Sequence, residues 1–173
     1  MELIKPCEEY LDSYYKGCTE TWGHVHDSYI LHNPKEYDEW KTHIFKDYEN
    51  QELGINLPDG FVPNATFWLV KRDTGKYLGT VNIRLKLTDK LVEYGGNLGV
   101  VLTMSERGKN LGAEITKLAV EKMKEMNISP IVITCEESNT PSWKILEHLP
   151  YSKKEAYETI LNNNLTQVRR YIL

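Results

Sequence analysis

The sequence predicts a mixed α/β fold, with a mostly antiparallel central sheet, one strand-turn-helix-strand crossover and flanking helices. Three observations predict it. Residues 65–104 have the pattern of strands separated by turns, residues 111–126 carry apolar side chains at helical spacing, and residues 129–137 form a continuous apolar run typical of a buried strand. A chain of 173 residues that is 40% apolar and 27% charged suits a single domain, 1–173, with one core.

Residues 1–64 are predicted to be mainly helical. A short strand at 2–5 precedes helices around 7–21 and 35–51, and the second helix is rich in Tyr, Trp and His. Aromatic side chains at this spacing could line a pocket, but packing against a sheet is the more common role. Residues 53–64 are predicted to be a loop because of Gly54, Pro58, Gly60 and Pro63.

Three strands are expected at 65–72, 77–87 and 91–104. The turns DTGK and LTDK between them suit antiparallel hairpins. We place the glycines of GGNLG, residues 95–99, inside the third of these strands, and its last residues, VVLTM, lead directly into the turn before a helix.

The predicted helix has one apolar stripe, formed by Leu111, Ile115, Leu118, Ala119, Met123 and Met126. The strand at 129–137 should be central and parallel to the strand before the helix. A second helix at 140–149 begins at Asn139 or Thr140 as the cap, with Pro141 in its first turn. Strands at 152–161 and 165–173 follow, joined by a tight turn at 162–164.

The turn before the first of these helices, SERGKNLG at 105–112, contains two glycines. Glycine in the first turn of a helix costs backbone entropy and adds no packing, so we expect a ligand to approach the main chain there. Free N–H groups at the positive end of the helix dipole, with Arg107 and Lys109 beside them, predict a phosphate or pyrophosphate cradle. A Walker A loop is excluded because Asn110 follows Lys109, and GGNLG lacks the spacing of a dinucleotide-binding fingerprint.

The stretch 107–112, RGKNLG, resembles the Q/R-x-x-G-x-G/A loop of the GNAT superfamily of acetyl-CoA-dependent N-acyltransferases. The order of strands and helices over 65–173 is similar to that family. CEESNTPSWKILEHLPY also resembles its later segment, in which an Asn follows the fifth strand and a Ser or Ala comes three residues on, here Asn139 and Ser142. LPDGFVP with FWLV, and VNIR followed by LVEYGGNLG, are similar to a bacterial branch of acetyltransferases.

The resemblance implies the acyl-CoA N-acyltransferase fold, with acetyl-CoA as co-substrate and an amine of a small molecule or peptide as acceptor. Residues 65–173 would form the acetyl-CoA-binding core and 1–64 the acceptor side. A backbone N–H near Val100 would hold the oxyanion as the amine attacks the thioester directly. The implied acetyl-CoA-binding residues are Val100, Leu102, Arg107, Gly108, Lys109, Asn110, Leu111, Gly112, Ala113, Asn139 and Ser142. Asn110 replaces the usual glycine, and Asn tolerates the left-handed conformation best among the other residues.

Two catalytic residues are expected, Glu93 as base and Tyr151 as acid. An alkyl ammonium with a pKa of about 10.4 is only about one part in a thousand neutral at pH 7, so a base is useful. Glu93 is expected to begin the fourth strand. Many superfamily members use a Tyr as the acid where this chain has Leu146, so Tyr151, Cys135 or Ser142 would substitute, or the thiolate would leave unaided. A non-catalytic acyl-CoA-binding domain is therefore the alternative.

Composition limits the other function classes. A net charge of -4 and a pI near 5.8 argue against a nucleic-acid partner. The absence of a leader pattern and of any apolar run near the roughly 18 residues of a membrane helix predicts a cytoplasmic protein without a membrane partner. His24 and His26 lack further ligands at useful spacing, and the three cysteines lack metal or redox spacing, so no metal is expected. The oligomeric state stays open, and a homodimer is one option.

Overall fold

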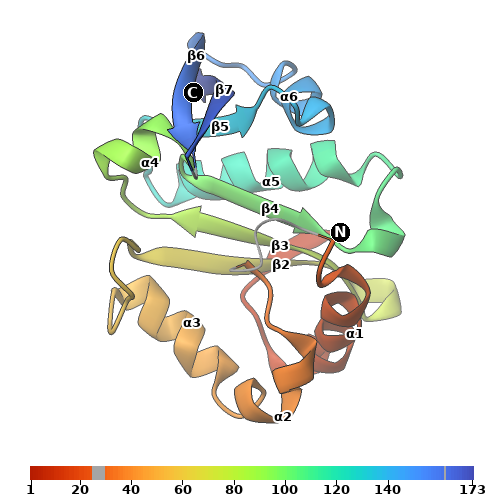
Figure 1. The fold of residues 1–173 in the computed structure, drawn as a ribbon. Coiled ribbons are helices and arrows are strands. Elements are labelled where there is room, and N and C mark those ends of the chain that lie inside the picture. Colours follow the sequence, from red (N-terminus) through yellow and green to blue (C-terminus); the bar gives the residue numbers. More distant parts are fainter. Residues whose placement is uncertain (25–29, 162) are drawn as a thin grey trace.

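The computed structural model describes residues 1–24, 30–161 and 163–173, and it contains two antiparallel sheets (Figure 1). The first sheet has the order β1 (Glu2–Ile4), β2 (Asn64–Lys71), β3 (Lys76–Arg84) and β4 (Leu98–Leu102). The second has the order β5 (Val132–Glu136), β7 (Asn164–Ile172) and β6 (Lys153–Leu161). The predicted α/β class with antiparallel sheets and flanking helices is confirmed.

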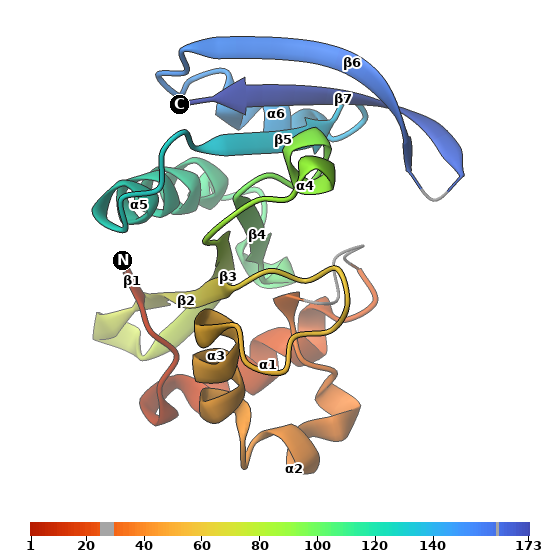
Figure 2. The ribbon, with the colours of Figure 1, turned by 90° about the vertical axis from the view of Figure 1, so that its left-hand side faces the viewer.

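Helices lie on both faces of the first sheet (Figures 1 and 2). On one face are α1 (Leu11–Thr21), α2 (Tyr37–Trp40) and α3 (Ile44–Leu53). The other face is covered by α5 (Leu111–Glu125), which lies between the two sheets, and α6 (Thr140–Leu146) follows β5. Short 3-10 turns are found at Glu8–Tyr10, Pro34–Glu36, Arg72–Thr74 and Met104–Glu106. Within the described ranges, no helix is long and apolar enough to span a bilayer.

Each face of the first sheet carries its own apolar core. Between sheet and α5, the core is aliphatic and includes Val81, Ile115 and Met123, all fully buried. On the helical side it is aromatic, and Tyr14 stacks on Trp68 with ring centroids 4.3 Å apart. The packing role expected for the aromatic side chains is confirmed for Tyr14, whereas Tyr29 lies outside the described residues.

Three predicted elements are wrong in detail. Residues 89–93 form helix α4 (Asp89–Glu93), because the Thr88 hydroxyl caps it by accepting from the Leu91 N–H at 3.3 Å, so LTDK is not a hairpin turn. β4 therefore begins only at Leu98, and Gly95 and Gly96 lie in the preceding loop with φ of 113° and 57°. The helix expected at 35–51 is split into α2 and α3 by residues 41–43.

Strand β5 also differs from the prediction of a central strand. Its ladder is antiparallel with β7, and it forms the edge of the second sheet that faces the first. The two sheets are joined through Asn97, just before β4. The Asn97 N–H donates to the Val132 carbonyl at 2.6 Å, and its side-chain oxygen accepts from the Val132 N–H at 2.8 Å.

Beyond this junction β4 and β5 diverge, as Figure 2 shows, where β5 runs across the view and β4 is seen nearly end-on.

The final hairpin follows the prediction. Asn163 adopts a left-handed φ of 64° and Asn164 begins β7, whereas Asn162 lies outside the described residues.

Candidate active site

Two cavities of similar size meet at the loop between α4 and β4. One, of about 420 Å³, lies on the helical side of the first sheet and is lined by residues of α3, the loop 57–62 and strands β2 and β3. The other, of about 440 Å³, lies between β4, β5, α5 and α6. We call them the sheet-face cavity and the interstrand channel. Tyr94 and Gly95 line both, so the two cavities adjoin at this loop.

The edge of β4 that faces the channel carries main-chain groups with no strand opposite. The main-chain N–H of Arg84 donates to the Asn97 carbonyl at 2.8 Å, and the main-chain N–H of Thr103 donates to the Leu78 carbonyl at 3.0 Å. The register between these two bonds has no shift, so odd-numbered residues of β4 bond to β3. The N–H groups of Leu98, Val100 and Leu102 consequently point away from β3, toward the channel.

The loop before α5 has left-handed backbone conformations at the glycine and the asparagine before the helix. Gly108 has a φ of 74°, and Asn110, at the helix N-cap, has a φ of 61°. The N–H groups of Gly108, Lys109 and Asn110 have no acceptor within the described part of the chain. Arg107 donates its Nε to the Leu102 carbonyl at 3.3 Å, which ties this exposed loop to the end of β4.

Lys109 is held by a carboxylate. Its Nζ lies 3.2 Å from Glu106 Oε1, which Lys76 also contacts at 2.5 Å. Hydrogen bonding from Lys76, with a further contribution from Lys109, lowers the pKa of Glu106 although burial opposes this. The loop therefore keeps its shape through charged contacts of its own.

The second glycine has a packing role, which corrects the expectation that neither glycine serves packing. A Cβ at Gly112 would lie 2.7 Å from Cδ1 of Ile145, so the absence of a side chain lets α6 approach α5 closely. A Cβ at Gly108 would meet nothing within 4 Å, so only its backbone conformation requires glycine. Leu111 and Ala113 lie with Gly112 in the first turn of α5.

The structure places several expected residues on the wall of the channel, among them Val100, Asn139 and Ser142. Asn139 caps α6, as predicted, and its side-chain oxygen accepts from the Ser142 N–H at 3.3 Å. Leu146 also lines the channel and is 3% exposed. Its side chain is aliphatic, so it supplies no hydroxyl there. Burial raises the pKa of the neighbouring Cys135 thiol to about 11, against a lowering hydrogen bond with Ser142.

The two residues expected to be catalytic line neither cavity. Glu93 is the exposed last residue of α4 and not the start of a strand, and its carboxylate accepts a hydrogen bond from the Thr159 hydroxyl of β6. Tyr151 donates its hydroxyl to Glu147 at 3.3 Å and packs its ring on Tyr171 at 5.4 Å.

A polar cluster that the sequence did not reveal lies at the junction of the cavities. The Tyr94 hydroxyl donates to Glu136 Oε1 at 3.0 Å, and the Ser138 hydroxyl donates to Glu136 Oε2 at 3.2 Å. Tyr94 and Glu136 are far apart in sequence and meet because residues 94–97 run beside β5, where Gly95 donates to the Thr134 hydroxyl at 2.8 Å. No spacing pattern could have indicated this contact.

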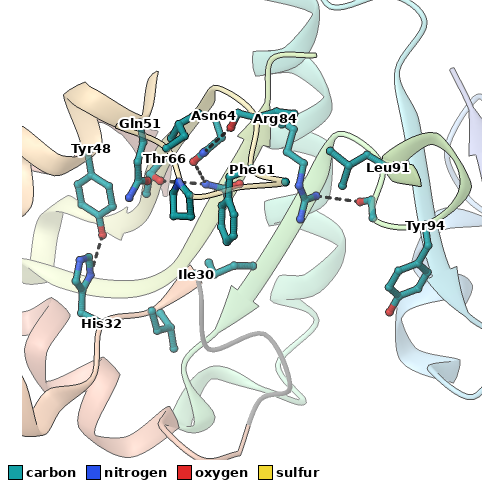
Figure 3. A pocket seen from close by; sticks show the side chains of 17 residues that line it. Ile30, His32, Tyr48, Gln51, Phe61, Asn64, Thr66, Arg84, Leu91 and Tyr94 are labelled. Atoms are coloured by element: carbon teal, nitrogen blue, oxygen red, sulfur yellow. Dashed lines mark hydrogen bonds between the residues drawn. The ribbon is translucent and has the colours of Figure 1, made fainter. Parts of the chain in front are cut away.

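The sheet-face cavity is elongated (Figure 3). His32 and Tyr48 lie at one end, and Arg84, Leu91 and Tyr94 lie toward the other. His32 Nδ1 is 2.9 Å from the Tyr14 hydroxyl, to which the Tyr48 hydroxyl donates at 3.3 Å. Burial lowers the pKa of His32 to about 4, so its imidazole is neutral at pH 7.

Near the junction, Arg84 Nη1 donates to the carbonyls of Gly95 and Gly96, both at 3.0 Å.

Over the described residues, no group of three or more His, Cys, Asp or Glu is arranged to hold a metal ion, and His26 lies outside them.

The site thus combines a loop with free N–H groups before α5, an open strand edge and two adjoining cavities. The acetyltransferase (GNAT) domain model matches residues 2–151. The chain belongs to the GNAT acetyltransferase family. The family assignment places it among proteins that transfer acetyl groups to amines, and no curated protein sequence gives a significant match.

Solved GNAT structures share the fold. They include a spermidine N-acetyltransferase SpeG chimera from Vibrio cholerae and hSSAT, 12% identical with a TM-score of 0.61, covering 100% of this chain and 96% of that one. RimL, a ribosomal L7/L12 α-N-protein acetyltransferase in complex with coenzyme A, is 13% identical with a TM-score of 0.62, covering 99% and 92%. The ribosomal-protein-S5-alanine acetyltransferase from Vibrio fischeri is 16% identical with a TM-score of 0.61, covering 99% and 90%. At these identities the likeness shows the fold alone.

Proposed function

We propose that this GNAT protein transfers the acetyl group of acetyl-CoA to a primary amine of a small molecule or peptide by direct attack. The observation that carries the proposal is the meeting of the two cavities at Tyr94 and Gly95. The interstrand channel suits the pantetheine arm and thioester, and the sheet-face cavity suits the acceptor. Each substrate then has its own entrance, and the reacting groups meet without a covalent enzyme intermediate.

Acetyl-CoA binding falls to the loop and helix start from Arg107 to Ala113. The free N–H groups of Gly108, Lys109 and Asn110 suit the pyrophosphate, and the dipole of the 15-residue helix α5 favours negative charge there. The open edge from Val100 to Leu102 suits a pantetheine arm bound like an added strand. Asn139 and Ser142 form the facing wall of the channel.

The Val100 N–H is the proposed oxyanion donor. It points to the channel and is fixed by the β3–β4 ladder, so it needs no reorganisation when negative charge develops on the thioester oxygen. Removing one such donor in other enzymes costs on the order of 3 kcal/mol of transition-state stabilisation. A rigid main-chain group can therefore supply a large part of the rate.

Tyr94 and Glu136 are the proposed route for the proton. The amine lone pair forms the new C–N bond, the C–S bond of the tetrahedral intermediate breaks, and one proton must move from nitrogen to sulfur. The Glu136 carboxylate takes the proton from nitrogen, while the Tyr94 hydroxyl gives its own proton to the thiolate and recovers one from Glu136. The 3.0 Å hydrogen bond between the two side chains supports this relay.

A non-catalytic acyl-CoA-binding domain is the second candidate, and Leu146 is the observation that favours it, since leucine cannot donate a proton. The hydroxyls of Tyr94 and Ser142 on the same channel favour the enzyme.

Two measurements separate the candidates. Calorimetric titration with acetyl-CoA, coenzyme A and ATP tests the cradle, and thiol release from acetyl-CoA with a panel of amines tests the transfer. The proposal expects acetyl-CoA binding and amine-dependent thiol release with formation of the N-acetyl product. Binding of acetyl-CoA without product from any amine in the panel favours the binding domain, and absence of binding contradicts both.

A further inference from the structure

The amide of Asn82, in the sheet-face cavity, is oriented by hydrogen bonds that start at a main-chain carbonyl. The Val62 carbonyl can only accept, so the amide nitrogen of Asn64 must face it, and this bond is 3.0 Å long. The Asn64 oxygen then faces Asn82 and accepts from its amide nitrogen at 2.6 Å. The same nitrogen also donates to the Thr66 hydroxyl at 3.3 Å, so both of its hydrogens are used.

With the amide nitrogen oriented in this way, the Asn82 side-chain oxygen has no hydrogen-bond partner among the described residues. A flipped amide would place two oxygens against each other at Asn64, so the orientation is determined by the chain itself. Asn82 is only 8% exposed, and it lines the cavity. The oxygen therefore opens onto the cavity, and a molecule that enters the cavity can donate an N–H to it.

The position of Asn82 relates it to the open edge of β4. Its register partner is Gly99, so the two residues lie side by side on the same face of the sheet. A Cβ at Gly99 would lie 2.7 Å from Cδ1 of Ile30 and 3.8 Å from Cβ of Asn82. The missing side chain therefore lets Ile30 pack directly on β4 next to Asn82. Val100, whose N–H points into the channel, is the next residue along β4.

We propose that the Asn82 side-chain oxygen binds an N–H of the acceptor amine in the sheet-face cavity and turns its nitrogen toward the thioester at β4. This rests on the proposed function and names a binding group for it. A neutral primary amine suits the site because one N–H can bond to Asn82 while the lone pair points at the carbonyl carbon. Asn64 is the positioning residue, since it presents its oxygen to the amide nitrogen of Asn82.

The test compares Asn82→Leu, which removes the amide, with Asn82→Gln, which keeps an amide that can donate to Asn64 and accept from the amine. Asn50→Leu on α3, outside both cavities, is the matched control. For an amine that wild-type protein acetylates, Asn82→Leu should raise the amine KM about 10-fold or more, as expected for a lost hydrogen bond to a charged or reacting group. Asn82→Gln should retain a KM within about threefold of wild type on the same scale.

The acetyl-CoA Kd, measured by calorimetry, separates this inference from the function on which it rests. An unchanged Kd in all three variants, together with the KM rise in Asn82→Leu alone, supports it. The inference is overturned if Asn82→Leu and wild type have equal amine KM values, or if the amine KM rises equally in both Asn82 variants. In either case the carbonyl oxygen does not bind the amine. Wild-type protein that binds acetyl-CoA yet acetylates no amine overturns the enzyme function, and this inference with it.

Discussion

At the scale of single residues, Gly108 and Asn110 show how far residue type alone predicts conformation. Both adopt positive φ, and the tolerance of Asn for that region was predictable from the sequence. The close contact between Gly112 and Ile145 was not, because it depends on where α6 packs. Sequence therefore indicated the shape of the cradle but not the reason for each glycine.

Gly108→Ala tests the cradle. The new methyl group would meet nothing within 4 Å, so its effect comes from the positive φ, at a cost of about 1–2 kcal/mol. We predict an acetyl-CoA Kd that is about 5- to 30-fold weaker, measured by calorimetry, because the loop must leave its binding conformation. Asn110→Gly, which relieves the same kind of strain, is the control and should bind at least as tightly as wild type. Equal affinities for Gly108→Ala and wild type would mean that this loop does not hold the ligand.

His32 makes stability depend on pH. Its pKa is about 4 in the folded state, mainly because of burial, and about 6.5 when unfolded. The unfolded state thus binds more protons between pH 6.5 and 4, so the contribution of His32 is complete above pH 6.5 and is lost as pH falls through that window. We predict that about 2 kcal/mol of this contribution is lost between pH 7 and 5, measured by urea unfolding.

A variant pair isolates the His32 contribution. His32→Gln should show a smaller pH dependence than wild type, whereas exposed His148→Gln should match wild type. Parallel pH profiles for His32→Gln and wild type would contradict the assignment.

At the scale of elements, α4 shows where pattern reading fails. Val92 and Tyr94 are residue types common in strands, so the segment resembled the start of a long strand. The signal for a helix was Thr88 as cap with Asp89 in the first turn. The difference matters because it turns Glu93 to the surface and brings Tyr94 to the junction of the cavities.

Neighbouring residues at the end of α4 therefore test the proton route. We predict that Tyr94→Phe lowers kcat about 100-fold, since it removes the proposed acid and keeps the ring. Glu93→Gln, on the surface, should stay within about twofold of wild type. Thiol release at saturating acetyl-CoA provides both values, with the acetyl-CoA Kd as the check on binding. A large loss in Glu93→Gln with full activity in Tyr94→Phe would instead support Glu93 as the base.

At the scale of the whole molecule, the sequence predicted every strand segment but not the division into two sheets. An apolar run such as 129–137 is compatible with a central strand or with an edge strand that faces another sheet. The choice depends on Asn97, which bonds to Val132 on one side and through its side-chain nitrogen to the Arg84 carbonyl at 2.9 Å on the other. The channel exists because the sheets are joined there and separate beyond it.

Asn97→Ala should weaken this junction. Asn97 is 2% exposed, so the variant leaves the Val132 N–H and the Arg84 carbonyl without their side-chain partner in a buried site. We predict a loss of about 2–4 kcal/mol in the free energy of unfolding, measured with urea. Asn50→Ala on α3 is the control, with an expected change within about 0.5 kcal/mol. Similar stabilities for the two variants would show that Asn97 does not hold the sheets together.

Acetyl transfer at the open edge of β4 should depend on the Val100 N–H, and the kcat of Val100→Pro measures this dependence. Proline removes the one N–H proposed to hold the oxyanion, and this N–H points away from β3, so the ladder keeps its bonds. At saturating acetyl-CoA and with an amine that wild-type protein acetylates, we predict a kcat about 10²- to 10³-fold lower in a variant that still unfolds cooperatively. A folded Val100→Pro variant with the kcat of wild type would contradict the account.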